Sequence, residues 1–288
     1  MICFHHNDLD GRCAGAMVSR YMDCRKPECF IEVDYVKVPD ASMIKRGEDV
    51  FIVDYCYTKA TVSQLEAIIE KAGHVVWIDH HKSSSDLLLD TSDYDFLSDD
   101  KLKIVVDTKL CGAALTFMYF EYESGHHMPR FLRYVDDWDR WAKRYPESYK
   151  FKLGMDSIDH SPTNQIWRDL MFDADVTERV LQYGDIIEDY VTSHNTEYRN
   201  QFAFKCIVNG LKCYALNLKE NSKAFGDLVN QCDAVVTFVF NGTSYQYSIY
   251  STNKEIDCSK VAECYGGGGH PGAAGFECDT LILERADW

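Results

Sequence analysis

Apolar residues in the first 120 positions fall into two alternating patterns. Short, almost continuous apolar runs rich in Val, Ile and Phe alternate with longer stretches in which apolar residues recur every three or four positions. The first pattern is typical of strands buried on both faces, and the second of amphipathic helices. This order predicts a mainly parallel sheet that helices cover on both sides. The predicted strands span residues 2–4, 31–38, 50–55, 74–79 and 103–106, and the predicted helices span 14–21, 63–72 and 111–121.

The pattern changes twice in the rest of the chain. Helical periodicity dominates from Arg130 to about Glu197, and a polar segment follows it. Beyond this segment, strand patterns flank Asn209-Gly210 and Asn241-Gly242, dipeptides that favour two-residue hairpin turns. The sequence therefore predicts an α/β domain over residues 1–195, a linker over 196–202 and a smaller α+β domain over 203–288.

The charge and the cysteine content limit the kinds of partner. The 288 residues include 46 acidic and 30 basic ones, and the net charge of −16 argues against binding long duplex nucleic acid, which relies on Lys and Arg. Apolar runs are too short to span a bilayer, so we expect no membrane partner. The twelve cysteines contain no C-x-x-C pair and are expected to be free thiols, which together with the absence of a leader-like start indicates the cytoplasm. Whether the chain is a monomer or a homodimer stays open.

Candidate metal ligands follow three of the predicted strands directly. The carboxyl ends of parallel strands share one edge of a sheet, where ligands of such folds bind. Side chains alternate along an extended segment, so residues spaced by two point the same way; this favours His6 over His5, which remains the alternative. The side chains expected at this edge are His6, Asp8 and Asp10 after the first strand, Asp54 after the third, and Asp79, His80 and His81 after the fourth.

So many carboxylates at one edge of a sheet require cations. Two like unit charges about 4 Å apart repel by roughly 4 kcal/mol at an effective dielectric constant near 20. Mixed carboxylate and imidazole ligands suit Mn²⁺, with Mg²⁺ as the alternative, and a pair of such ions stabilises the attacking and leaving oxygens of a phosphoryl displacement. The strand ends therefore predict a two-metal phosphohydrolase.

Five segments, in order along the chain, resemble motifs of the DHH phosphoesterase superfamily. Four match the catalytic domain: HHNDLDG at 5–11, the isolated Asp54, the triplet at 79–81, and YVDDWDRW at 134–141. The fifth, GGGGHPGAAGF at 266–276, is similar to the glycine-rich signature of the DHH-associated domain that follows in many members. The resemblance implies a DHH catalytic domain, then a substrate-binding domain, with the active site in the cleft between them.

The resemblance also implies two sets of metal ligands. One ion is expected at His6, Asp8 and Asp54. The second is expected at Asp10, Asp54, His80 and an aspartate of the fourth motif. For that aspartate Asp137 is preferred to Asp136, because Arg140 and an aromatic residue follow it in the way the family pattern requires. Asp54 would then bridge the two ions.

Further roles follow from the same resemblance. His81 is expected beside the scissile phosphate, with Asp79 orienting a ligand histidine and Arg140 near the phosphate. In the second domain, bare backbone N–H groups can approach and hold a phosphate or nucleotide. The residues expected to do so are Gly267, Gly268, Gly269 and His270.

The expected activity is Mn²⁺-dependent hydrolysis of short nucleotide phosphoesters by a hydroxide that two metal ions activate. Nano-RNA, linear dinucleotides and 3′-phosphoadenosine phosphate are the candidate substrates. A polyphosphate or pyrophosphate hydrolase is the alternative within this class, and a nucleotide sensor without catalysis is the alternative outside it. The strand before the glycine-rich segment has Tyr250 where oligonucleotide-degrading members commonly have an arginine. The sequence therefore indicates phosphoester hydrolysis more strongly than it indicates any one substrate.

Overall fold

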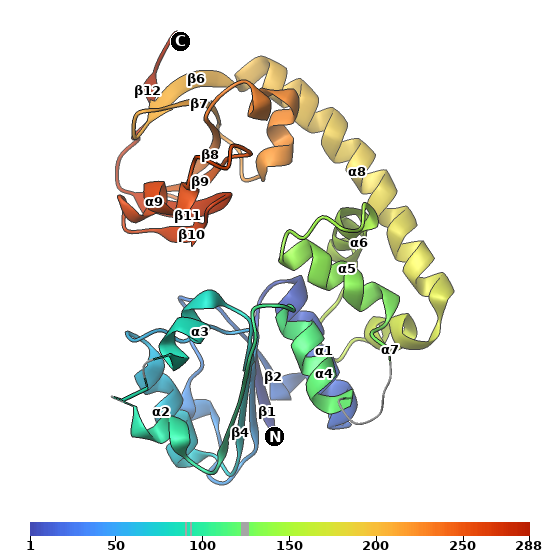
Figure 1. The fold of residues 1–288 in the computed structure, drawn as a ribbon. Coiled ribbons are helices and arrows are strands. Elements are labelled where there is room, and N and C mark those ends of the chain that lie inside the picture. Colours follow the sequence, from blue (N-terminus) through green and yellow to red (C-terminus); the bar gives the residue numbers. More distant parts are fainter. Residues whose placement is uncertain (90, 93, 122–126) are drawn as a thin grey trace. The chain divides into compact units, whose positions relative to one another are not determined.

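The chain divides into two units, Met1–Glu188 and Asp189–Trp288. The computed structural model describes residues 1–89, 91–92, 94–121 and 127–288 (Figure 1). Each unit has its own sheet and its own hydrophobic core, so each is described by itself.

The first unit is built on five parallel strands in the order β2-β1-β3-β4-β5, which confirms the predicted α/β class. β1 pairs with β2 on one side and with β3 on the other, so the strand order reverses at this point. Ligands of open α/β sheets bind at the carboxyl ends of the strands beside such a reversal. The strands are β1 (Ile2–His6), β2 (Phe30–Val33), β3 (Val50–Val53), β4 (Val75–Asp79) and β5 (Leu102–Val106).

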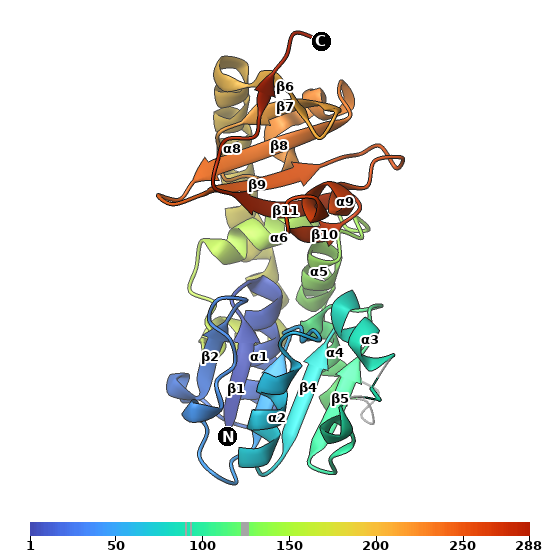
Figure 2. The same cartoon turned by 90° about the vertical axis from the view of Figure 1, so that its left-hand side faces the viewer.

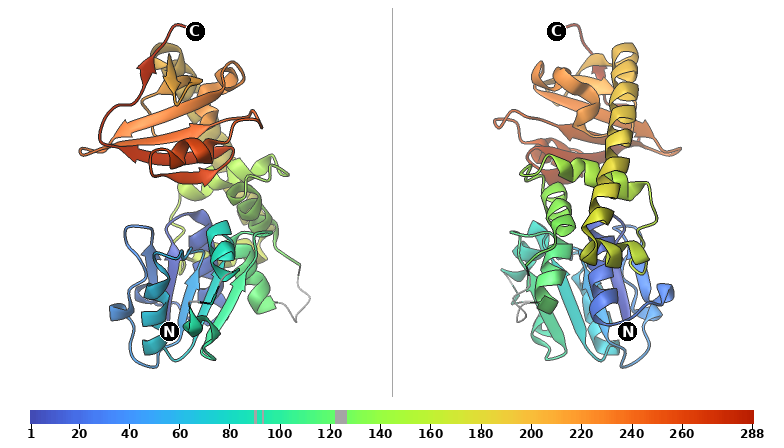
Figure 3. Two further views of the ribbon diagram at one scale, coloured as in Figure 1. Left: turned by 60° about the vertical axis from the view of Figure 1, so that its left-hand side comes forward. Right: turned by 90° about the vertical axis from the view of Figure 1, so that its right-hand side faces the viewer.

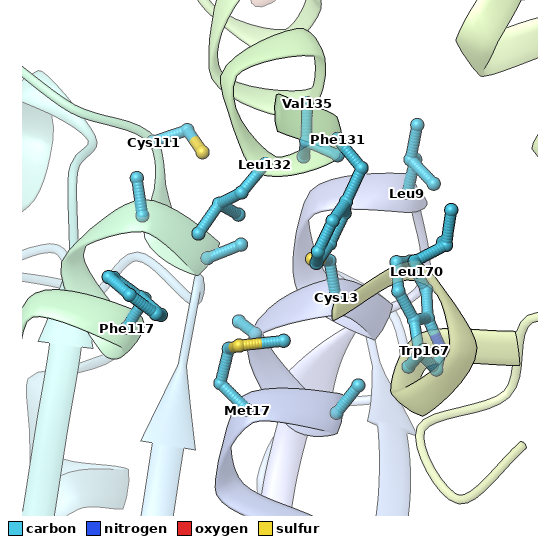
Figure 4. Close-up of a cluster of buried hydrophobic side chains, with 14 of the residues drawn as sticks. Leu9, Cys13, Met17, Cys111, Phe117, Phe131, Leu132, Val135, Trp167 and Leu170 are labelled. Carbon is cyan, nitrogen blue, oxygen red and sulfur yellow. The ribbon is translucent and has the colours of Figure 1, made fainter. Parts of the chain in front are cut away.

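Helices cover both faces of this sheet (Figures 1 and 2). On one face, Met17 of α1, Phe117 of α4 and Leu132 of α5 meet in a buried cluster (Figure 4). On the other face, Leu65 of α2 and Leu87 of α3 pack against the sheet. The helices of this unit are α1 (Leu9–Tyr21), α2 (Val62–Lys71), α3 (Lys82–Leu88), α4 (Gly112–Glu121), α5 (Arg130–Asp139), α6 (Glu147–Asp156) and α7 (Gln165–Phe172), with short 3-10 helices at Pro27–Cys29, Ala41–Met43 and Asp95–Ser98.

The second unit has seven strands in the order β10-β11-β9-β8-β7-β6-β12, antiparallel except where β7 meets β8. Both predicted hairpins are present, and Asn209 and Gly210 have the positive φ values of 48° and 80° that a tight turn of this kind requires. Between β7 and β8 the chain forms a 3-10 segment, Ser222–Asn230, with a kink at Gly226. The other elements are β6 (Phe204–Val208), β7 (Leu211–Leu216), β8 (Ala234–Phe240), β9 (Tyr245–Tyr250), α9 (Cys258–Glu263), β10 (Gly268–His270), β11 (Ala273–Cys278) and β12 (Glu284–Arg285).

One continuous helix, α8 (Ala174–Phe202), contains the boundary between the units (Figure 3). Residues 196–202, expected as a linker, form its last turns. The segment contains no proline, and its polar residues are compatible with a solvent-exposed helix, so composition alone does not distinguish it from a loop. Within the described ranges, no helix is both long and apolar enough to cross a bilayer.

Candidate metal centre and active site

Asp54 occupies the centre of the candidate site, directly after β3 and beside β1. Its φ of 54° is unusual for a residue other than glycine, and its backbone N–H donates to the Ile78 carbonyl at 2.8 Å. Gly112 makes room for it, because a Cβ there would lie 2.6 Å from the Asp54 Cβ. The side chain is thereby held in the interior, where the residue is only 1% exposed. Such backbone strain is often found at functional sites.

The first group of candidate ligands joins Asp54 to the end of β1. His6 Nδ1 lies 2.8 Å from Asp8 Oδ2 and 4.0 Å from Asp54 Oδ2. His5 is fully buried and its Nδ1 pairs with the His6 carbonyl, so the preference for His6 agrees with this geometry. The alternation of side chains holds only in an extended strand, and β1 ends at His6, so it does not predict where Asp8 and Asp10 point. Asp8 is already the N-cap of α1, accepting from Gly11 N at 2.9 Å.

The second group surrounds His80. Its Nε2 lies 3.2 Å from Asp54 Oδ1, 3.4 Å from Asp139 Oδ2 and 3.7 Å from Asp10 Oδ2. Asp10 is anchored by the first turn of α4, because its carboxylate accepts from Gly112 N at 2.7 Å and Ala113 N at 2.9 Å. Candidate ligand atoms within 4.8 Å of one another form three clusters: Asp54 with His6 and Asp8, Asp54 with His80 and His81, and Asp10 with His80 and Asp139. Asp54 therefore joins the first group to His80 of the second.

Asp137, the expected fourth-motif ligand, lies outside this group, and Asp139 is the aspartate of that motif that lies within it. Asp137 accepts from Arg144 N at 2.7 Å and from the Ser148 hydroxyl at 2.5 Å, so it anchors the chain after α5. The alternative, Asp136, accepts from Cys111 N at 2.8 Å.

Helical spacing explains why Asp139 is the residue that faces the site. Leu132 and Val135 of α5 are buried, and Asp139 follows them on the same face at i+7 and i+4. Asp137 lies two positions before Asp139 on the helix, so its side chain points away from that face. The three aspartates of the motif cannot be distinguished by type, but the i, i+3, i+7 pattern of the apolar residues was a usable signal.

His81 and Asp79 form a hydrogen-bonded pair at the edge of the groups. His81 Nδ1 lies 2.7 Å from Asp79 Oδ1, and Asp79 is fully buried. Burial lowers the pKa of His81, but the hydrogen bond and the charge of Asp79 outweigh it, so the pKa is raised from its ordinary value. His81 also offers a ligand atom close to those of Asp54 and His80.

The contacts of the Arg140 side chain mainly stabilise the fold. Its guanidinium donates to the Lys109 carbonyl and lies 3.4 Å from Asp136 Oδ1. Burial and the nearby carboxylates raise the pKa of Asp139 well above its ordinary value, and the positive charge of Arg140 offsets this only in part. The predicted contact of Arg140 with phosphate stays a prediction.

The electrostatics of the two groups fit divalent cations. Burial raises the pKa of Asp54 well above its usual range, and the neighbouring carboxylates raise it further. Asp54 Oδ1 and Asp139 Oδ2 are buried without a hydrogen-bond partner among the described residues. Buried carboxylate oxygens of this kind need protons or metal ions, and the mixed oxygen and imidazole set suits divalent ions such as Mg²⁺ or Mn²⁺.

Comparisons with known proteins find similarity over almost the whole chain. No family model matches it. It is 24% identical to oligoribonuclease NrnB of Bacillus subtilis (strain 168), over 98% of this chain and 73% of that protein. Its fold is similar to that of a pGpG-specific phosphodiesterase from Vibrio cholerae, with a TM-score of 0.53 and 14% identity over 97% of this chain and 94% of that one.

A second solved structure is itself a DHH domain. It comes from a protein described as a member of a family of ribosomal proteins, and it matches with a TM-score of 0.51 and 15% identity over 99% of this chain and 82% of that one. The chain therefore shares its fold with a solved phosphodiesterase and a solved DHH domain. The triplet at the end of β4 and the motif at the end of β1 supply His6, Asp8, Asp10 and His80 of the two ligand groups, and Asp54 and Asp139 complete them.

The residues of the glycine-rich segment in the second unit serve different purposes. Gly266 has a φ of 77° in the turn two residues after Cys264, the C-cap of α9, and its N–H donates to the Glu263 carbonyl. A Cβ at Gly267 would lie 2.2 Å from the Gly275 carbonyl oxygen, and one at Gly269 would lie 2.6 Å from the Ala274 Cα, so close packing of β10 on β11 accounts for both. Gly268 has open space around its Cα, and it is exposed, as is His270. Of the four residues predicted to hold a phosphate or nucleotide, Gly268 and His270 are therefore the two whose presence packing does not explain.

Metal binding to the first unit is expected to raise its thermal stability. A ligand at about 100 times its Kd adds about 2.7 kcal/mol, which corresponds to roughly 5–10 °C in Tm for a unit of this size. The measurement is Tm of the EDTA-treated chain with and without Mg²⁺ or Mn²⁺. Asp54→Asn should reduce the shift strongly, because Asp54 belongs to the first group and lies 3.2 Å from His80 Nε2 of the second. An equal shift in this variant would mean that the ions bind elsewhere.

Two alanine substitutions separate packing from ligand contact in the glycine-rich segment. Gly267→Ala is expected to destabilise the chain by about 1–3 kcal/mol, because the methyl group overlaps the neighbouring strand. Gly268→Ala should leave Tm nearly unchanged and raise KM for a nucleotide substrate by about tenfold, because it blocks close backbone approach. Urea unfolding and steady-state kinetics measure the two effects. A Gly268→Ala chain with wild-type KM would remove Gly268 from the substrate site.

Proposed function

We propose that this protein hydrolyses phosphoester bonds of short nucleotides with the help of two divalent ions. The observation that carries the proposal is the convergence on Asp54 of two groups, one with His6 and Asp8 and the other with Asp10, His80 and Asp139. When bound, the ions would supply Lewis-acid stabilisation of charge at the phosphorus centre and a nucleophile at neutral pH. Mn²⁺ is the proposed native ion.

The residues of the chain would hold and orient the reacting groups. Asp54 would contribute to both ion sites, and the hydrogen bond from its backbone N–H to the Ile78 carbonyl helps to hold its position. His81, with Nδ1 bonded to Asp79, presents Nε2 as the atom that can donate a proton toward a leaving oxygen. Burial of Asp79 keeps this pair in one orientation, which a proton donor needs.

The proposed substrates are nano-RNA of a few residues, linear dinucleotides and 3′-phosphoadenosine phosphate. Similarity over 98% of the chain to a protein named an oligoribonuclease supports a short oligonucleotide, as does the fold shared with a phosphodiesterase specific for the dinucleotide pGpG. Gly268 and His270, exposed on the second unit, are proposed to contact the nucleotide. All twelve cysteines are free thiols, which supports the proposed cytoplasmic location.

A substrate panel tests this proposal. Di- to pentanucleotides, a cyclic dinucleotide, adenosine 3′,5′-bisphosphate and polyphosphate would each be incubated with the protein in Mn²⁺ and in Mg²⁺. Release of mononucleotide from the shortest linear substrates is the expected result. Cleavage of polyphosphate alone would contradict the proposed substrate class, and binding without cleavage of any member would indicate a sensor.

A further inference from the structure

A pocket lined by arginines lies at the far end of α1 from the candidate metal centre. Its cavity volume is about 330 Å³, close to the lower end of the roughly 300–1,000 Å³ range of small-molecule sites. α1 has 13 residues, so its two ends are about 18 Å apart at ~1.5 Å per residue. The metal ligands flank the first turn of α1, whereas Arg20 in its last turn lines the pocket. The pocket is therefore a different site from the candidate active site.

The pocket is lined by positive charges, although the protein as a whole is negatively charged. Arg20, Arg25 and Arg168 line it, and none of its lining residues is Asp or Glu, although the chain carries a net charge of −16. Arg168 is exposed and makes no ion pair with a described residue. Arg25 has one loose partner, with its Nε 3.7 Å from the exposed Asp23. Guanidinium groups that line one cavity, with no acidic residue in its lining, favour the binding of an anion.

Two further features of the pocket add to this preference. Arg20 Nε is buried without a hydrogen-bond partner among the described residues, so the pocket wall contains an unsatisfied donor. The first turn of α7 also lines the cavity through Asn164 and Gln165, and the positive end of a helix dipole favours anions. α7 is fixed against α1 by Trp167, which packs into the shared core (Figure 4).

An exposed aromatic ring gives the pocket a second kind of contact. Phe172 lies at the rim with 69% of its surface exposed, and the Arg20 guanidinium is 4.9 Å from the centre of its ring. Exposed aromatic rings beside arginines stack well on nucleobases, whatever the base. A phosphate alone would use the arginines but not the ring.

We infer that this pocket binds a nucleoside monophosphate, with the phosphate on the arginines and the base against Phe172. Calorimetric titration of the full chain with AMP, in the presence of Mn²⁺, is the test. AMP should bind, and adenosine and inorganic phosphate should each bind more weakly. Arg168→Gln and Arg25→Gln should each raise Kd for AMP by about tenfold or more, whereas Arg46→Gln, at an exposed arginine outside the pocket, should not change it.

Two controls keep this inference separate from the proposed hydrolysis. AMP binding should persist in the Asp54→Asn chain; its loss there would place AMP at the metal centre and overturn the inference. Phe172→Ala should weaken AMP but not phosphate, and phosphate binding as tight as AMP in the wild type would equally overturn it. Photolabelling with 8-azido-AMP should mark peptides within residues 162–172. None of these readouts depends on catalysis, so a negative result leaves the phosphoesterase proposal intact.

Discussion

Replacing Asp54 by Asn is expected to lower kcat/KM for a short oligonucleotide by about 10³-fold or more. Asp54 contacts both ligand groups, so the substitution would weaken both ion sites at once, and loss of several kcal/mol of charge stabilisation corresponds to this factor. Asn is close in shape to Asp and also tolerates positive φ, so the strained backbone at φ 54° should be kept. Steady-state kinetics at saturating Mn²⁺ measure the effect.

A surface variant serves as the matched control for this prediction. Asp175→Asn removes the same charge from an exposed position on α8, outside both ligand groups, and should leave kcat/KM within about twofold. Circular dichroism would verify that both chains fold. Substantial activity in a folded Asp54→Asn chain would contradict the two-metal proposal.

The second large effect is expected from Asp139→Asn, compared with Asp137→Asn. Asp139 lies 3.4 Å from His80 Nε2, so its replacement should lower kcat/KM by about 10²-fold or more and weaken binding of one ion. Asp137→Asn should instead lower the free energy of unfolding by about 1–3 kcal/mol, because its carboxylate accepts from Arg144 N and the Ser148 hydroxyl. Kinetics, metal titration and urea unfolding on the two chains measure these effects.

The two variants give opposite results under the competing assignments. If Asp137 were the ligand, Asp137→Asn would lose metal affinity at unchanged stability, and Asp139→Asn would retain activity. The pair shares one helix and one chemical change, so a difference between them can arise only from where each side chain points. That result would also decide the fourth-motif assignment, which the sequence resemblance places at Asp137.

The sheet could be predicted from the sequence because its signals are local. Strands such as Val50–Val53 and Val75–Asp79 are apolar throughout, and this pattern occurs where a parallel strand is buried on both faces. The second strand is shorter than its pattern predicts. It ends at Val33 because the Asp34 side chain accepts from Val36 N and Lys37 N and closes a turn, a side-chain effect that periodicity does not report.

By itself the sequence determined which chemical groups stand at the strand ends. His6, Asp54 and His80 follow apolar strands, and a parallel sheet brings such positions to one edge whatever the loops do. Tertiary structure alone decided which neighbours complete each group. Asp137 and Asp139 differ by two helical positions, so the docking of α5 on α1 and α4 turns one toward His80 and the other toward Ser148. Likewise, Gly267 and Gly268 are identical in type, and only the approach of β11 separates a packing glycine from an exposed one.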